Sequence, residues 1–331
     1  MNKNQKIFLI TLTAITLIAF TLITYTTTKS PTLTTSNKLQ IITSFYPLTY
    51  LTQQIGGEYI EVTQLIPNNV DIHSWEPSIS HIMTTEDANI IFYNGADADH
   101  WMEEHIIPVL STSNNNNRVI IKTTENLTLI ENLEHDHKEN GHNHGLYDPH
   151  TWISPYIAKQ QAEIIYNTLV TVDPQHEKYY TQRWNKLEQK LDQLDKAYLQ
   201  ELKASNGNIF VSHEAYGYLA YRYTFTQHGV IGLSADQQPS IILLSQLINE
   251  MKEHQTYILY FDPVYSDKYI QTIKNDLQTQ TGQNVTMLKL YLMMGPIDGL
   301  DYLEQMQINL VNLQIGLEIT LEIDKCPGEI L

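Results

Sequence analysis

Histidines are concentrated in one short stretch of this 331-residue chain, which contains 13 of them. Between residues 134 and 152 the sequence reads EHDHKENGHNHGLYDPHTW and holds five. Residues 134–147 have no apolar periodicity and cannot build a core, which predicts a solvated loop that attracts metal ions. The alternative is an ordinary charged surface loop. The four histidines of this loop are His135, His137, His142 and His144.

The fifth histidine of the stretch, His150, has a different setting. It follows Asp148 and Pro149 and precedes Trp152. Proline restricts its own backbone and that of the residue before it, so this is a rigid turn. A neutral imidazole held in one orientation suits tight metal binding. We therefore expect the loop histidines to collect metal and His150 to belong to a fixed site.

Three other segments carry a candidate ligand in a loop or directly after a predicted strand. They contain His73 in DIHSWEPS, His213 after NIFVS, and Asp298 in GPIDGL. Ligands of parallel α/β sheets bind in loops beyond the carboxyl ends of strands. One loop histidine is more often structural, but three with a carboxylate in matching positions predict a metal site. Such a set suits tetrahedral Zn²⁺, whereas Mn²⁺ prefers more oxygen ligands.

The elements that must position these residues are alternating strands and helices. This alternation predicts parallel α/β sheets. The predicted strands share β-branched and aromatic residues between turn signals. They cover residues 39–47, 61–67, 89–95 and 118–122 in the first half, and 208–212, 256–263 and 284–290 in the second.

A long helix is predicted from Asp173-Pro174 to about Ala204, because an N-cap residue followed by proline opens helices. Its apolar residues recur at spacings of 4, 3, 4, 3 and 4. At 1.5 Å per residue such a helix is about 45 Å long and can span two lobes. It could also pack along one domain or form a coiled-coil arm. The apolar positions are Tyr180, Trp184, Leu187, Leu191, Leu194 and Tyr198.

The N-terminus predicts a membrane segment. Lys3 and Lys6 precede an uncharged run from Ile7 to Tyr25. Its length is close to a membrane span, so residues 1–25 form either an uncleaved anchor or a cleaved signal. Lysines before it place the rest of the chain outside the cytoplasm. Residues 26–38 are rich in Thr, Ser and Pro and predict a tether.

Composition excludes some classes of protein. The formal net charge of −17 makes nucleic acid an unfavourable partner, because phosphate contacts need clustered Lys and Arg. Cys326 is the only cysteine, which excludes an internal disulfide and a Cys-based zinc finger. The role of the tail at 319–331 is not predicted.

The chain resembles the zinc/manganese-type (cluster A-I) substrate-binding proteins of ABC importers, and is most similar to the zinc type. The resemblance runs from about Leu39 to Leu317. Its motifs, in order, are DIHSWEPS, the His-rich loop followed by DPHTWISP, the DP-initiated helix, SHEAYGYLAYRY, GLSADQQPS and PIDG…DYLEQMQINLVNL. A lipid-anchor cysteine near the N-terminus, usual in such proteins, is missing here.

The resemblance implies an α/β fold of two β/α lobes, each a roughly four-stranded parallel sheet with flanking helices. One long rigid helix at 173–204 would join a lobe at 39–172 to a lobe at 205–318, with one metal in the cleft between them. His73 and His150 would come from the first lobe, and His213 and Asp298 from the second.

Some details of the implied site stay open. His213 matches the zinc type, whereas Asp298 stands where that type often has Glu. Asp298 could therefore ligate directly or through water, or the three histidines could suffice. Glu76 and Glu214 are expected to support the ligands. The rings of Trp75 and Trp152 either shield the site from water or pack in the core. Because imidazoles must be neutral to bind, we expect affinity to fall as pH drops through about 6.5.

The implied function is that of an extracytoplasmic solute-binding protein. It would capture Zn²⁺ as transported ligand and deliver it to a membrane ABC permease, as a monomer without catalytic activity. Mn²⁺ binding in the same transporter class is the first alternative. A zinc hydrolase with Glu214 as general base, or an adhesion or metal-buffering protein, are others.

Overall fold

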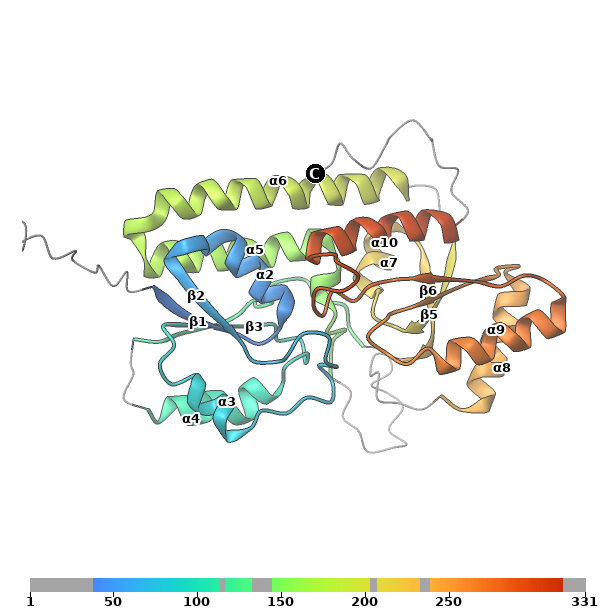
Figure 1. Ribbon diagram of the computed structural model, residues 1–331, viewed down its shortest axis with the longest axis horizontal. Helices are drawn as coiled ribbons and strands as arrows, with labels where there is room; N and C mark the ends of the chain where they lie inside the picture. Colours follow the sequence, from blue (N-terminus) through green and yellow to red (C-terminus); the bar gives the residue numbers. More distant parts are fainter. Residues whose placement is uncertain (1–37, 114–116, 133–144, 203–206, 233–238, 318–331) are drawn as a thin grey trace, which may run out of the picture. The chain divides into compact units, whose positions relative to one another are not determined.

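The computed structural model describes residues 38–113, 117–132, 145–202, 207–232 and 239–317 (Figure 1). The predicted N-terminal anchor, nearly all of the tether, the four loop histidines and the tail lie outside these residues. Within the described ranges, no helix is both long and apolar enough to cross a membrane.

The first sheet has four parallel strands in the order β2-β1-β3-β4. Its strands are rich in isoleucine and valine, which favour the pleated, buried surface of a parallel sheet. The central strand β3 is buried along its whole length. The strands are β1 (Leu39–Thr43), β2 (Ile60–Gln64), β3 (Ile90–Tyr93) and β4 (Val119–Lys122).

The second sheet repeats this arrangement with the order β6-β5-β7-β8, again with all strands parallel. In each sheet the strand that comes second along the chain, β2 or β6, lies at an edge. The two halves therefore share one topology. The strands are β5 (Asn208–His213), β6 (Thr226–Ile231), β7 (Ile258–Phe261) and β8 (Thr286–Lys289).

Helices flank both sheets (Figure 1). In the first half they are α2 (Tyr46–Gly56), α3 (Ile79–Thr84), α4 (Ile107–Ser111) and α5 (Pro155–Val172). In the second half they are α7 (Gly217–Tyr223), α8 (Ile241–Glu253), α9 (Lys268–Thr281) and α10 (Tyr302–Gly316).

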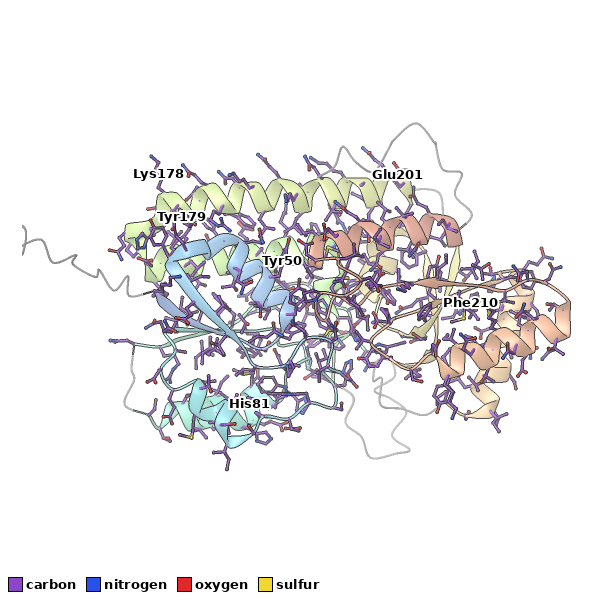
Figure 2. The ribbon with its side chains drawn as sticks, viewed as in Figure 1. Tyr50, His81, Lys178, Tyr179, Glu201 and Phe210 are labelled. Carbon is purple, nitrogen blue, oxygen red and sulfur yellow. The ribbon has the colours of Figure 1, made fainter. Side chains whose placement is uncertain are left out.

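The long helix α6 (Glu177–Glu201) follows a 3₁₀ turn at Pro174–His176 and has 25 residues, about 38 Å at 1.5 Å per residue. The six apolar positions predicted from its sequence are its buried residues. It contacts α2 and α5 beside the first sheet and α7 and α10 beside the second. Figure 2 shows Lys178 and Glu201 at its opposite ends. The predicted two-lobed fold with a connecting helix is confirmed.

The hydrophobic core is continuous between the two lobes. Polar contacts also cross between them: Trp152 Nε1 donates to the Leu292 carbonyl at 2.8 Å, and Asn69 N donates to the Met294 carbonyl at 2.9 Å. A second apolar cluster fills the outer part of the second lobe around Phe210 and Leu259. Contacts on this scale favour a fixed arrangement of the lobes over wide hinge motion.

Strand β6 was not expected from the sequence. Its residues TQHGVI contain only two large apolar side chains, and Gly229 weakens the strand pattern. The strand forms because β5 supplies a parallel partner along its length, from Asn208↔Thr226 to His213↔Ile231. Pairing with a neighbour therefore overrides a weak local preference.

Leu191 lies in the middle of the buried face of α6 and has no exposed surface. We expect Leu191→Ala to lower the free energy of unfolding by about 2–5 kcal/mol, because it leaves a cavity between the helix and the core. Chemical denaturation of the full chain measures this change. Lys190→Ala, at an exposed position of the same helix, is the control and should stay within about 0.5 kcal/mol. Equal effects would contradict the assignment of the buried face.

Candidate metal centre

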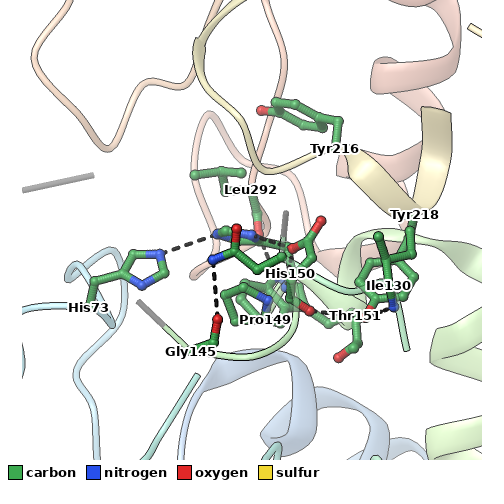
Figure 3. Close-up of polar contacts among 12 residues, drawn as sticks. His73, Ile130, Gly145, Pro149, His150, Thr151, Tyr216, Tyr218 and Leu292 are labelled. Atoms are coloured by element: carbon green, nitrogen blue, oxygen red, sulfur yellow. Dashed lines mark hydrogen bonds and ion pairs between the residues drawn. The ribbon is translucent and has the colours of Figure 1, made fainter. Parts of the chain in front are cut away.

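Three histidines from distant parts of the chain converge at one point. The candidate ligand atoms of His73, His150 and His213 all lie within 4.8 Å of one another. The Nε2 atoms of His73 and His150 are 3.2 Å apart (Figure 3). The His213 ring centroid lies 4.8 Å from that of His150 and 5.6 Å from that of His73. Among the described residues this is the only group of metal-ligating side chains so close together.

His150 is buried and fixed by its own turn. The Asp148 carboxylate accepts a hydrogen bond from the His150 backbone N at 2.9 Å and lies 2.8 Å from the ring Nδ1. Tyr218 OH donates to the Asp148 carbonyl at 2.9 Å, and the Asn94 amide donates to the Pro149 carbonyl at 3.2 Å. A carboxylate on Nδ1 sets the tautomer that leaves Nε2 as the metal-facing atom.

His73 lies in the loop after β2, and its backbone N donates to Asp71 Oδ1 at 2.9 Å. The same oxygen accepts a hydrogen bond from Tyr265 OH of the second lobe, also at 2.9 Å. The first lobe therefore builds both ligand turns on one pattern, Asp-x-His, in which the aspartate binds the histidine backbone two residues later. The roles of Asp148 and Tyr265 were not expected from the sequence, although the repeated Asp-x-His spacing indicates Asp148.

His213 is the last residue of β5, so its position is fixed by the second sheet. Its side chain is only 2% exposed. The Tyr265 ring lies edge-on to the imidazole, with centroids 5.5 Å apart. This is the expected location for a ligand in a parallel sheet, just at the carboxyl end of a strand.

Burial beside two other imidazoles lowers the pKa of His73. Burial, followed by the proximity of His150 and His213 and then of His100, holds the pKa of His73 well below its usual value of 6.5. Burial disfavours the charged imidazolium, and neighbouring imidazolium charges oppose its formation. The ring nitrogen of His73 is thus available to a cation at more acidic pH than that of a histidine with the usual pKa of 6.5.

The structure does not bring Asp298 to the three histidines. Its carboxylate accepts hydrogen bonds from Lys289 Nζ at 2.5 Å and Tyr291 OH at 2.8 Å, and these bonds lower its pKa. Its side chain is 40% exposed. Asp298 has a positive φ of 55°, inside a tight turn closed by Ile297 and Leu300. This turn directs the carboxylate back to the end of β8. That direction cannot be read from the position of Asp298 after a strand in the sequence.

The residues expected to support the ligands also differ in their surroundings. The Trp152 ring lies 5.4 Å from the His150 ring and is buried, so it borders the site and packs in the core. Trp75 packs edge-on against Trp101 at 4.6 Å. The Glu214 carboxylate accepts from Gly229 N at 2.8 Å and so supports β6. Glu76 is exposed and faces two other histidines, which are described below.

Two similar lobes, a connecting helix and three histidines that converge between them are typical of a metal substrate-binding protein. The family comparison agrees: residues 41–316 match the model described as ZnuA, zinc-uptake complex component A, periplasmic. The chain belongs to this family, which confirms the resemblance drawn from its motifs.

Individual relatives show the same similarity. The chain is 31% identical over 296 residues to the high-affinity zinc uptake system protein ZnuA of Bacillus subtilis, covering 88% of this chain and 91% of the relative. It is 30% identical over 286 residues to the zinc-binding lipoprotein AdcA of Streptococcus pneumoniae, covering 84% of this chain but only 55% of AdcA. The Zn(II)-bound ZnuA-like domain of that AdcA superposes with a TM-score of 0.69 at 27% identity, covering 85% of this chain and 99% of the domain.

The Asp148 carboxylate gives one test of the site. We expect Asp148→Asn to weaken zinc binding by about 10- to 100-fold, because the amide no longer fixes the His150 tautomer as the carboxylate does. Competition with a zinc chelator measures the affinity. Asp173→Asn is the matched control, since Asp173 holds His176 Nδ1 in the same way at 2.6 Å outside the three-histidine group. An affinity loss in the control as large as in Asp148→Asn would show that the effect is not specific to the site.

The lowered pKa of His73 gives a second test. In the metal-free chain the His73 ring should titrate well below pH 6.5, whereas histidines of the urea-unfolded chain should titrate near pH 6.5. Because the unfolded state takes up this proton first, acidification below about pH 6.5 should also reduce the stability of the metal-free fold. NMR titration of the ring resonances measures the pKa. A midpoint at or above 6.5 for His73 would contradict the described packing.

Proposed function

We propose that this protein captures Zn²⁺ outside the cytoplasm and delivers it to an ABC permease in the membrane. The observation that supports this most directly is the convergence of His73, His150 and His213 within 4.8 Å. Membership of the zinc-uptake family supplies the transport role. The ligands come from both lobes, so a bound ion would join them.

The donor set favours zinc over manganese. The described group offers three imidazole nitrogens and no carboxylate, and imidazole suits Zn²⁺ while Mn²⁺ prefers oxygen ligands. Three histidines leave one position of a tetrahedral site for water or another ligand. The absence of Asp298 from the group strengthens this preference. Manganese remains the alternative for the same transporter class.

The hydrolase alternative has less support. Three histidines with an open fourth position also occur in catalytic zinc sites, where a carboxylate acts as general base. Glu214 is the carboxylate expected in that role, but it accepts a hydrogen bond from the backbone N of Gly229 in a strand. The family is a transport component rather than a family of enzymes. We therefore propose binding and transfer of the ion without turnover.

The remaining features of the function are proposals of the same kind. We infer that residues 1–25 attach the monomeric chain to the membrane, with 26–38 as tether. Residues 39–172 and 205–318 would form the two metal-binding lobes, joined by 173–204. His135, His137, His142 and His144 would collect metal near the site. The family description as periplasmic supports an extracytoplasmic location.

The three ligands can be tested together. We expect the wild-type chain to bind one tight zinc that excess Mn²⁺ does not displace, and the combined change of His73, His150 and His213 to Ala to abolish that event. Calorimetry with elemental analysis measures both results. Retention of tight zinc by the triple variant would contradict the ligand assignment. Displacement of zinc by manganese would contradict the choice of metal but leave the transport role intact.

The weaker sites of the histidine loop need a separate control. Changing His135, His137, His142 and His144 to Ala should remove weak binding while leaving the tight event in place. Loss of the tight event in this variant would show that the loop supplies a ligand, contrary to the proposal.

A further inference from the structure

A second group of potential ligands lies on the surface of the first lobe. The two carboxylate oxygens of Glu76 face two different imidazoles: Oε1 lies 3.9 Å from His100 Nε2, and Oε2 lies 3.8 Å from His105 Nε2. The three side chains are 60%, 42% and 51% exposed, respectively. An ion arriving from solvent can therefore reach all three without any rearrangement of the core.

The backbone beside these histidines has an unusual conformation that brings them to one side. In a regular α-helix, residues five apart point about 140° away from each other, because each residue advances about 100°. Met102–Ile106 instead forms a π-helical turn, in which Ile107 N bonds to the Met102 carbonyl. His105 lies within this turn and His100 two residues before it, and both imidazoles approach Glu76. Such turns are rare and frequently occur at functional sites.

The scaffold beneath the group is rigid even though its side chains are exposed. Trp75, the neighbour of Glu76, packs against fully buried Trp101, the neighbour of His100, with ring centroids 4.6 Å apart. Met102 and Ile106 anchor the π-turn in the core. The other carboxylate on the turn that has a described partner, Glu103, is paired with Lys122 at 2.5 Å. Glu76 is thus the carboxylate positioned between the two histidines.

This group is close to the three-histidine centre. Glu76 and His73 are three residues apart in one loop, so their Cα atoms are at most about 11 Å apart. An ion held at Glu76 would therefore be carried by the same loop as His73, the first-lobe ligand of the tight site.

We propose that Glu76, His100 and His105 form a second binding site for a divalent cation, with zinc as the preferred ion. Two imidazoles and a carboxylate are a common zinc donor set. Tetrahedral zinc places its ligand atoms about 3.4 Å apart, which is shorter than both Glu76–histidine distances, so the three exposed side chains must move closer together to hold one ion. The group is looser than the three-histidine centre and binds more weakly. Its role as a relay to His73 rests on the proposed zinc-capture function.

The site is tested with Zn²⁺ alone, using the full-length chain in which the four loop histidines are changed to Ala. Calorimetry should show one tight event and one weaker equivalent. Glu76→Gln and the double change of His100 and His105 to Ala should each weaken the second event at least tenfold and keep the first. Glu104→Gln is the matched control: it removes an exposed carboxylate from the same turn and should change neither event.

The outcomes separate the two proposals. A tight event without a second equivalent, or a second equivalent that persists in both variants, overturns the surface site. Loss of the tight event alone overturns the zinc-capture proposal and leaves the surface site standing. For the relay, stopped-flow tryptophan fluorescence should show several-fold slower loading of the tight site in Glu76→Gln at unchanged affinity. An unchanged loading rate overturns the relay.

Discussion

Three imidazoles can face one another at these distances only while their backbones are fixed. Like charges on His73, His150 and His213 would repel strongly in a buried setting. The rest of the structure meets this constraint. Burial disfavours the proton on His73, Asp148 holds His150 in one orientation, and the second sheet fixes His213 at the end of β5. The protonated form of His73 is thereby disfavoured.

The constraint also explains why both lobes share a core. Ligands from two independent domains would drift by more than the length of a coordination bond. Here α6 packs against helices of both lobes, and backbone contacts such as Asn69 to Met294 cross between them. The protein therefore presents a largely preformed site, in which little ordering is required when an ion binds.

The parts of this structure that could be predicted from sequence are those governed by periodicity and strand ends. The one-sided apolar pattern of α6 marked its buried face, and positions after strands marked His213. Local geometry limited the rest. Asp298 lies in a loop that suits a ligand, but its carboxylate accepts hydrogen bonds from Lys289 and Tyr291 and does not join the three histidines. Glu76 is three residues from His73 in the sequence, yet its partners are His105, within the π-turn at Met102–Ile106, and His100, just before that turn. Neither the direction of the Asp298 carboxylate nor the partners of Glu76 can be predicted from residue spacing.

Asp71 Oδ1 is a single atom that accepts hydrogen bonds from both lobes. It accepts one hydrogen bond from the His73 backbone and another from Tyr265 OH of the opposite lobe. Tyr265 in turn borders the His213 ring. A force that separated the lobes would withdraw Tyr265, release one bond on the loop that carries His73, and remove an aromatic wall from His213. Separation of the lobes would therefore loosen the surroundings of His73 and His213 at the same time.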